Sequence, residues 1–516
     1  MRLAPLLAIG ALLAAAWFGT LGLRPLYKAD EARYAEIPRE MVASGDWITP
    51  RLNGFKYFEK PPLQYWATGL FFEALGISDW TSRLWAALLG FAGILLVLSA
   101  GNRLFGPPAG TFAAAVLAAS PVYVAAAQIS SLDMGLAFFL SGAVLALACG
   151  YPIAFWVCCA LAVLSKGLVG IVLPLATLGL YILLKRDWRL IGDIRPISGP
   201  LVFLLIAAPW FVAISLRNPE FAHFFFIQEH FQRFTTAVHQ RTAPAWFFLP
   251  VLALDLAPLL LPTAMGWWRG LRSPAPSFDA AFWLALWALV VLAFFSVSSS
   301  KLPAYILPMF PALALLAGRY LAAAADRKLM LAQGAIVAAV GLAAAAILPG
   351  KGGPAYASYV PWLVAAGAVA AILGILSFWR KISIFALAAA GFLATQLAII
   401  GHGTISERFS AAALIASIEP KPPASAPVYA VDAYDHTLPW YLRRTVTMVA
   451  YRDELGVAID WDHGLFVPTV DEFERRWLAQ PNAYAFIGSG AFDKLATRLP
   501  MKVIARDARY VFVRKP

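Results

Sequence analysis

The sequence predicts an α-helical membrane protein with many spans, followed by a small α/β domain at its C-terminal end. Of the 516 residues, 61% are hydrophobic and 14% are charged, whereas soluble domains carry about 25% charged residues. Uncharged runs of about 20 residues, the length that an α-helix needs to cross a bilayer, recur over the first 400 positions. These runs are apolar on all sides, which argues against a large soluble helical protein with amphipathic stripes.

Thirteen apolar runs are expected to be membrane spans. A further apolar stretch, residues 63–75, is too short to span comfortably and is expected to lie at the interface or to re-enter the membrane. The expected spans are 3–23, 82–104, 109–127, 132–149, 153–164, 168–184, 200–216, 246–267, 280–297, 305–321, 329–348, 359–378 and 382–400.

Lys and Arg gather in every second loop between these spans, and such loops face the cytoplasm. We therefore expect the N-terminus inside and everything after residue 401 outside. Residues 1–23 lack a small-residue cleavage site, so the first helix is expected to stay as an uncleaved anchor. The basic loops contain Arg103, KRDWRLIGDIR (185–195), RGLR (269–272), DRK (326–328) and WRK (379–381).

The net charge of +12 lies largely in these short loops beside the spans. Inward topology and anionic lipid headgroups explain such a distribution, so nucleic acid is not an expected partner. The three cysteines, Cys149, Cys158 and Cys159, lie in or beside apolar spans, and no disulfide framework is implied.

The composition of the chain changes near residue 401. Short β-branched or aromatic runs at 427–432, 445–451, 483–489 and 510–514 alternate with segments of helical character such as 469–479, a pattern typical of an α/β domain. A proline-rich linker, EPKPPASAP, occupies 419–427. We therefore divide the chain into a transmembrane domain, 1–400, with structured outer loops at 24–80 and 217–245, and an outer α/β domain, 401–516.

The first outer loop begins with YKADEARYAEIPREM (27–41), which follows directly on the first span and contains seven charged residues. Helical spacing puts Asp30, Arg33 and Tyr34 on one face. Pro38 is expected to start a second short helix, because proline suits a first turn, and Gly45 is expected to end it.

The second part of this loop, WITPRLNGFKYFEKPP (47–62), predicts a β-hairpin. Asn53-Gly54 between two aromatic or β-branched arms is a strong signal for a two-residue turn. The hairpin would return the chain to Tyr57, Glu59 and Lys60, beside the start of the loop. The two charged clusters of the loop are therefore expected to meet.

Several residues of the outer loops suit the chemistry of a lipid phosphate. Arg can hold a phosphate bidentately and Lys acts on it as a point charge; a nearby carboxylate could accept a proton from an attacking hydroxyl. His230 with Glu229 or Glu59 could hold a divalent metal. The structural alternatives are charges that end a helix, a hydrogen-bonded histidine and snorkelling lysines such as Lys166. The candidate cations are Lys60, Lys301 and Arg233.

The stretch DEARYAEIPREMVASGDWITPRLNGFKYFEKPPLQYW (30–66) resembles the signature of bacterial lipid-carrier-dependent glycosyltransferases, and LSKG (164–167) and SKLPAYILP (300–308) support the resemblance. These are GT-C enzymes similar to protein O-mannosyltransferases and closest to the aminoarabinose transferases that modify lipid A. The resemblance implies a GT-C fold and an inverting transfer of a sugar from a polyprenyl-phosphate carrier, such as undecaprenyl phosphate. It places the reaction on the periplasmic side of the bacterial inner membrane.

The resemblance also implies roles for individual residues. Asp30 matches the catalytic aspartate of the family, with Glu31 beside it, and zinc would be held by Glu59 and His230. We expect the sugar or acceptor pocket around Arg33, Tyr34 and Tyr57. The donor phosphate is expected to contact Lys60, Tyr305, Lys301 and Arg233.

The expected function is aminoarabinose-type transfer to lipid A, and the alternative is mannosyl or hexosyl transfer to protein or another glycan. A transporter or flippase for lipid-linked sugars would instead predict ionisable residues within spans or paired broken spans. Asp255 is the main charge within a span, and no inverted repeat is visible. Asp30 would act as a general base towards a hydroxyl acceptor; towards an ionised phosphate it would orient the sugar or stabilise charge at the anomeric carbon.

Overall fold

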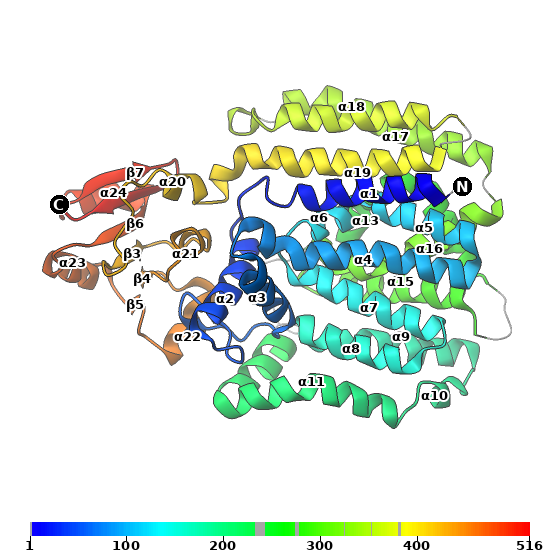
Figure 1. Cartoon of the computed structure of the whole chain (residues 1–516), viewed down its shortest axis with the longest axis horizontal. Helices are drawn as coiled ribbons and strands as arrows, with labels where there is room; N and C mark the ends of the chain where they lie inside the picture. Colours follow the sequence, from blue (N-terminus) through cyan, green and yellow to red (C-terminus); the bar gives the residue numbers. More distant parts are fainter. Residues whose placement is uncertain (1–2, 233–242, 274–277, 325, 352, 380–382) are drawn as a thin grey trace. The chain divides into compact units, whose positions relative to one another are not determined.

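The structure is a computed structural model that describes residues 3–232, 243–273, 278–324, 326–351, 353–379 and 383–516. The chain forms two compact units (Figure 1). The first, here called the helical unit, consists of Met1–Leu21, Glu59–Gln64 and Arg83–Thr404. The second, here called the α/β unit, consists of Gly22–Phe58, Tyr65–Ser82 and Ile405–Pro516.

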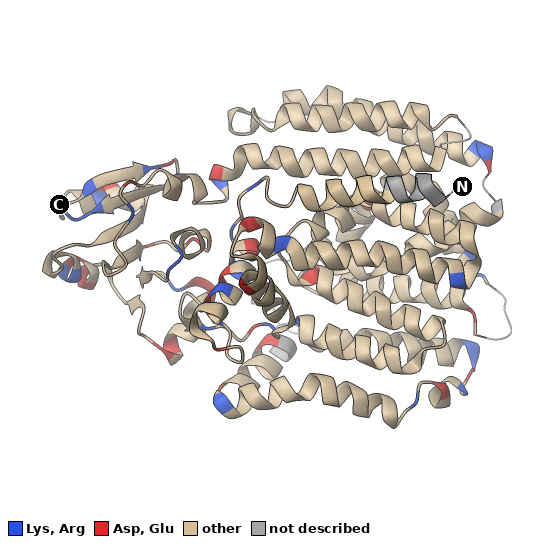
Figure 2. Ribbon diagram, viewed as in Figure 1, with Lys and Arg blue, Asp and Glu red and all other residues tan. Residues whose placement is uncertain are grey.

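The helical unit is built from long apolar helices that lie side by side (Figure 1). Most of their length carries no charged side chain, and the charges gather towards the helix ends (Figure 2). The principal helices are α1 (Leu3–Gly19), α4 (Asp79–Phe105), α5 (Pro107–Ala118), α6 (Pro121–Ala127), α7 (Leu132–Ala148), α8 (Pro152–Lys166), α9 (Val169–Lys185), α11 (Ser198–Arg217), α13 (Phe248–Leu256), α14 (Leu260–Leu271), α15 (Ala280–Val297), α16 (Phe310–Ala324), α17 (Arg327–Ile347), α18 (Val360–Leu376) and α19 (Ser383–His402).

Every expected span has an apolar helix at its place in the chain. Within the described residues, seven helices are long and apolar enough to cross a membrane, or eight if the pair α5–α6, bent by 71°, counts as one span. Five shorter apolar helices occupy the remaining expected positions. The membrane character predicted from the sequence is therefore confirmed, while the count of thirteen crossings stays a prediction.

Asp255, the acidic residue that the sequence places within a span, binds the start of α6 at the bend between α5 and α6. The buried carboxylate of Asp255 accepts hydrogen bonds from the hydroxyl of Ser120 and, at 2.9 Å, from the backbone N–H of Val122. These groups lie at the start of α6, where backbone N–H groups lack partners within the helix. Asp255 thus stabilises a helix end inside the bundle.

The α/β unit contains a six-stranded mixed sheet in the order β5-β4-β3-β6-β8-β7. The β3–β4, β3–β6 and β4–β5 pairs are parallel, and the pairs that β8 makes with β6 and β7 are antiparallel. The expected strands and the helix expected at 469–479 are present, which confirms the α/β prediction. The elements are β3 (Val428–Val431), α21 (Thr437–Leu442), β4 (Thr447–Val449), α22 (Gly456–Trp461), β5 (Phe466–Val467), α23 (Val470–Ala479), β6 (Tyr484–Gly488), α24 (Ser489–Ala496), β7 (Lys502–Arg506) and β8 (Tyr510–Arg514).

The first outer loop folds as one long helix, a hairpin and a shorter helix, α3 (Leu63–Leu75). The expectation that Pro38 starts a separate helix is wrong, because α2 (Asp30–Ser44) runs through Pro38 without interruption. Proline removes one backbone donor, but most of α2 is buried, so packing holds the helix together. Gly45 ends α2 at a φ of 70°, as expected.

The hairpin is confirmed. Strands β1 (Arg51–Leu52) and β2 (Phe55–Lys56) are joined by Asn53 and Gly54, which have φ values of 53° and 80°. Positive φ at both central residues is the requirement of a type I′ turn, and Asn-Gly meets it at low cost.

The structure divides the chain at different points from the sequence analysis, because most of loop 24–80 belongs to the α/β unit. The buried side chain of Asn53 donates to the carbonyl of Val446 at 2.9 Å and accepts from its N–H at 2.8 Å. Asp79 accepts hydrogen bonds from Trp440 and Tyr441, each at 2.9 Å. The first outer loop and the C-terminal segment (Ile405–Pro516) therefore share one core, although more than 300 residues separate them in the chain.

Candidate active site

Asp30 and Glu31 are adjacent in the first turn of α2, yet their surroundings differ. The side chain of Asp30 is 49% exposed and accepts a hydrogen bond from Arg33 Nη1 at 2.9 Å. The side chain of Glu31 is 4% exposed and forms a bidentate ion pair with Arg24, at 2.6 and 3.0 Å. Successive helical residues point about 100° apart, which sends one carboxylate towards solvent and the other into the core.

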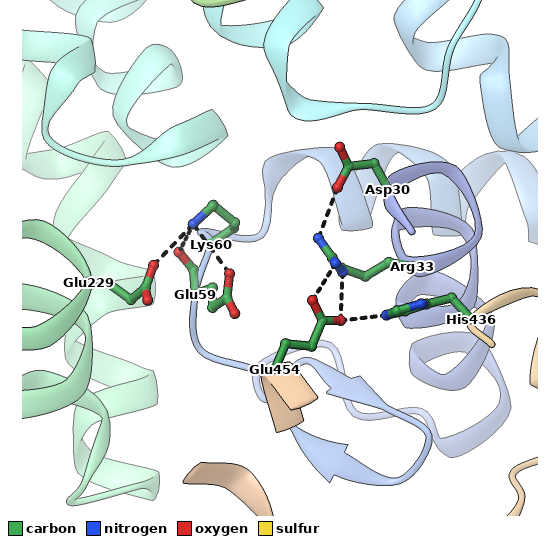
Figure 3. A network of polar contacts seen from close by, with 7 residues as sticks. All are labelled: Asp30, Arg33, Glu59, Lys60, Glu229, His436 and Glu454. Carbon is green, nitrogen blue, oxygen red and sulfur yellow. Dashed lines mark hydrogen bonds and ion pairs between the residues drawn. The ribbon is translucent and has the colours of Figure 1, made fainter. Parts of the chain in front are cut away.

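Arg33 lies at the centre of a charged network in the α/β unit (Figure 3). Its guanidinium contacts Asp30 with one nitrogen and Glu454 with two, with Nε at 3.0 Å from Glu454 Oε1. The guanidinium also lies 5.6 Å from the ring of Tyr34 and 6.0 Å from the ring of Tyr57. The helix and the hairpin therefore bring Asp30, Arg33, Tyr34 and Tyr57 together, as the sequence predicted.

Glu454 and His436 complete this network, and sequence reasoning missed both. His436 Nε2 lies 2.5 Å from Glu454 Oε1. Burial alone would raise the pKa of Glu454, but the hydrogen bond and charge of His436, together with Arg33, lower that pKa to about 2. Glu454 thus stays ionised throughout the neutral range. Nothing in the local sequence marks either residue, because their partner on α2 lies about 400 positions away.

The helical unit holds a second charged cluster, around Lys60 (Figure 3). Lys60 Nζ donates to the carbonyl of Glu59 at 2.8 Å and lies 3.7 Å from the Glu59 carboxylate. It also contacts Glu229 Oε2 at 3.3 Å. Two carboxylates therefore flank one ammonium group. Because Glu59 and Lys60 belong to a different unit from Asp30, their meeting with the start of the loop stays a prediction.

Two of the sequence-predicted site residues lie in or beside the segment η1 (His223–Gln232), which also carries Glu229. His230 belongs to η1, but its side chain lies outside the described residues. Arg233 lies outside the described residues altogether. Among the residues that the structure does describe, no group of three or more His, Cys, Asp or Glu side chains is arranged to hold a metal ion.

Lys301 and Tyr305 lie in a third polar region, within the helical unit. Lys301 is 6% exposed and donates to the carbonyl of Ser298. Tyr305, in η4 (Pro303–Met309), has its ring 5.1 Å from the ammonium of Lys166, which pairs with Asp133 at the start of α7. Asp133 is the residue that sequence reasoning missed here, although an acidic residue at the second position of an expected span could have indicated it.

Comparisons with known proteins identify the family of the chain. Residues 5–225 match the family described as dolichyl-phosphate-mannose-protein mannosyltransferase, and residues 414–515 match the aminoarabinose transferase C-terminal domain. The crystal structure of ArnT from Cupriavidus metallidurans bound to undecaprenyl phosphate is 35% identical. It superposes with a TM-score of 0.93 over 100% of this chain and 99% of that one.

The chain belongs to the aminoarabinose transferase (ArnT) family. The structure of the same Cupriavidus ArnT in the apo state gives a TM-score of 0.92 at 36% identity, over 99% of this chain and 98% of that one. The GT-C fold and the C-terminal domain expected from the sequence are thereby confirmed, and the chain is a multi-pass membrane protein.

Curated relatives carry the name undecaprenyl phosphate-alpha-4-amino-4-deoxy-L-arabinose arabinosyl transferase. One from Aeromonas hydrophila is 34% identical over 57% of this chain and 56% of its own length. One from Pseudomonas fluorescens is 34% identical over 62% of this chain and 60% of its own. These alignments span somewhat more than half the length of the curated relatives, whereas the structural match to the Cupriavidus ArnT is essentially complete.

The different surroundings of Asp30 and Glu31 generate a prediction about stability. Removing one partner of a buried ion pair costs about 3–5 kcal/mol, so Glu31→Gln should markedly lower the thermal stability of the purified protein. Asp30→Asn, at a half-exposed position, should change the stability by about 0.5 kcal/mol or less. Thermal unfolding of both variants in the same detergent measures this difference. Equal melting temperatures would contradict the buried role of Glu31.

Proposed function

We propose that this protein transfers 4-amino-4-deoxy-L-arabinose from undecaprenyl phosphate to lipid A on the periplasmic side of the bacterial inner membrane. The observation that carries the proposal is the superposition of the whole chain on an ArnT bound to undecaprenyl phosphate, with a TM-score of 0.93. The five basic loops favour a cytoplasmic N-terminus, which would put the α2 loop on the periplasmic side. Family membership favours an enzyme over the transporter alternative.

Asp30 is the proposed catalytic residue, since its carboxylate is half exposed whereas that of Glu31 is closed off by Arg24. Towards a hydroxyl acceptor, Asp30 would take the proton that leaves as the glycosidic bond forms, and such a base contributes typically about 10²–10⁴-fold. Towards an ionised phosphate no proton leaves, and Asp30 would orient the sugar or stabilise positive charge at the anomeric carbon. Glu31 would support Asp30 by fixing the first turn of α2.

The donor phosphate is proposed to bind Lys60, with Lys301, Tyr305 and Arg233 as further contacts. Lys60 is suited to this role because its ammonium can donate charge-assisted hydrogen bonds, and Glu59 and Glu229 now hold it in place near the start of α3. An arriving phosphate would replace part of that charge pairing by charge-assisted hydrogen bonds. Arg33, Tyr34 and Tyr57, which meet around one guanidinium, are proposed to line the sugar or acceptor pocket.

A zinc ion held by Glu59 and His230 remains part of the proposal. The described residues supply carboxylates at Glu59 and Glu229, both beside Lys60, and His230 follows Glu229 in the chain. Carboxylate and imidazole are ordinary zinc ligands, and a bound metal at such a place supplies positive charge for phosphate oxygens.

The second candidate function is the transfer of mannose or another hexose to protein or to another glycan. It is favoured by the match of residues 5–225 to the protein mannosyltransferase family. Mass spectrometry of lipid A and of exported glycoproteins, with and without the gene, separates the two: an aminoarabinose lost from lipid A supports the first, and a hexose lost from protein supports the second.

The role of Asp30 is tested in a purified system with undecaprenyl-phosphate aminoarabinose as donor and lipid A as acceptor. We expect Asp30→Asn to lower turnover by about 10²-fold or more while donor binding is retained. For transfer to an ionised phosphate, wild-type turnover should show no rise with pH through the carboxyl range; for a hydroxyl it should, and the variant should lose that rise. An Asp30→Asn protein with near-wild-type turnover would contradict the proposed function.

The role of Lys60 is tested by the affinity of the protein for undecaprenyl phosphate. A hydrogen bond to a charged group contributes about 1.5–3 kcal/mol, so Lys60→Ala should weaken donor binding by about tenfold or more. Lys28→Ala removes an exposed cation near the start of α2 and is the control for a general loss of positive charge. Unchanged affinity in Lys60→Ala, or an equal loss in both variants, would remove Lys60 from the phosphate site.

Elemental analysis of the purified protein tests the metal proposal. We expect about one zinc per chain, which Glu59→Ala and His230→Ala should each reduce, because a site with few protein ligands depends on every one of them. A zinc content no higher than that of the buffer, in protein active after treatment with a chelator, would end the proposal.

A further inference from the structure

We propose that His436 and Glu454 are positioning residues for the reaction at Asp30, and that they act through the guanidinium of Arg33. The C-terminal segment of the chain would thus take part in catalysis without touching the reacting atoms. This inference rests on the proposed function, in which Asp30 is the catalytic carboxylate.

The geometric basis is a continuous row of polar contacts within the α/β unit (Figure 3). His436 Nε2 lies 2.5 Å from Glu454 Oε1, and the same oxygen accepts from Arg33 Nε at 3.0 Å. Glu454 Oε2 accepts from Arg33 Nη2, and Arg33 Nη1 donates to Asp30 at 2.9 Å. The two-point grip by Glu454 fixes the plane of the guanidinium, and that plane determines where Nη1 points.

The exposed fraction of the side chain differs between the members of this row, and the difference suits a positioning role. The side chains of His436 and Arg33 are 6% and 7% exposed, that of Glu454 is 20% exposed, and that of Asp30 is 49% exposed. His436 and Arg33 are buried and Glu454 is largely buried, whereas Asp30, the last member, is open to a substrate. An arginine side chain otherwise has much rotational freedom, which Glu454 removes before the substrate arrives.

Two carboxylates, those of Glu454 and Asp30, surround the guanidinium of Arg33, and their charges compete for it. Arg33 divides its hydrogen bonds between Glu454 and Asp30, so that Asp30 receives one nitrogen rather than a bidentate fork. Without the charge of Glu454, the guanidinium would be drawn more strongly towards Asp30. A fuller ion pair would make the Asp30 carboxylate a weaker base and would hold it away from the substrate.

His436 is placed to keep Glu454 in this arrangement. It lies at the start of α21, next to Asp435, whose buried carboxylate binds Thr437 and, at 3.0 Å, Arg509 Nη1. The ring of Tyr434 packs edge-on at 5.0 Å. The imidazole therefore has a fixed direction, with Glu454 as its charged partner, Tyr434 as its aromatic neighbour and Asp435 turned to other groups.

The first test compares His436→Ala, His436→Gln and Glu454→Gln in the purified transfer assay with undecaprenyl-phosphate aminoarabinose and lipid A. A misplacement of about 1 Å can cost 10²-fold in rate, so His436→Ala and Glu454→Gln should lower kcat at least about tenfold. The affinity for undecaprenyl phosphate, which carries no sugar, should stay within about twofold, since its phosphate is proposed to bind Lys60. His436→Gln keeps an N–H donor near the position of Nε2 and should restore most of the rate.

Arg509→Gln is the matched control. It removes a contact of the same segment, at Asp435, that does not reach Arg33. A structural role of the segment would affect this variant and the His436 variants alike, with rates that follow the melting temperature. The proposal is overturned if folded His436→Ala and Glu454→Gln keep wild-type kcat. It is also overturned if His436→Gln is as impaired as His436→Ala, or if the rate falls equally in Arg509→Gln.

A second measurement does not depend on transfer. Carbodiimide labelling of the exposed Asp30 carboxylate, followed by mass spectrometry, reports its protonation as a function of pH. Glu454→Gln should lower the pH midpoint of this labelling by up to about one unit, because Arg33 turns to Asp30; an unchanged midpoint would overturn the proposal. Failure of the proposed function has a different signature, namely an active Asp30→Asn protein or a wild type that transfers no sugar.

Discussion

The structure of the α/β unit depends on the pairing of buried charges along α2. This helix is almost entirely buried, yet it carries six of the charged residues of the first loop. Each buried charge has partners: Glu31 has Arg24, Arg39 has Glu36 at 2.5 and 2.7 Å, and Arg33 has Glu454. An unpaired charge in such surroundings would cost several kcal/mol, so the partners fix where α2 can lie within the unit.

Glu40, another buried acidic residue of α2, connects the helix to the hairpin through hydrogen bonds. Its two carboxylate oxygens accept the backbone N–H groups of Asn53 and Gly54, at 2.5 and 2.8 Å. Burial and the nearby charge of Glu36 raise the pKa of Glu40 to about 8. Asn53 and Gly54, which adopt positive φ, thus also donate two backbone hydrogen bonds to the buried side chain of Glu40. The side chain of Asn53 in turn binds Val446 and connects the hairpin to the C-terminal segment.

The parts of the molecule that could be predicted from the sequence are those determined by neighbours in the chain. Apolar runs indicate membrane helices, Asn53-Gly54 indicates its turn, and the spacing of Asp30 and Arg33 puts them on one helix face, where the structure shows an ion pair. The prediction at Pro38 was wrong because packing against distant residues decides the outcome there. The burial of α2 outweighs the loss of one helical hydrogen bond. The short strands β5 and β7 were not predicted, although both contain β-branched or aromatic residues, and their pairing with β4 and β8 identifies them.

Only the part of the candidate site that lies in the first outer loop could be predicted in detail from the sequence. Asp30, Arg33 and Lys60 are visible in the first loop, and Glu229 was named as a candidate metal ligand, whereas Glu454 and His436 become partners of Arg33 only when distant segments meet. The distribution of these partners explains why a carboxylate pair stands directly after the first span. Glu31 forms an ion pair with Arg24 just after that span, which fixes the first turn of α2. Asp30, one residue earlier, is thereby held at the surface, where it accepts a hydrogen bond from Arg33, which also binds Glu454 of the C-terminal segment. In the proposed function, one acidic residue stabilises the position and the other is available for chemistry, a division of roles that a single carboxylate could not provide.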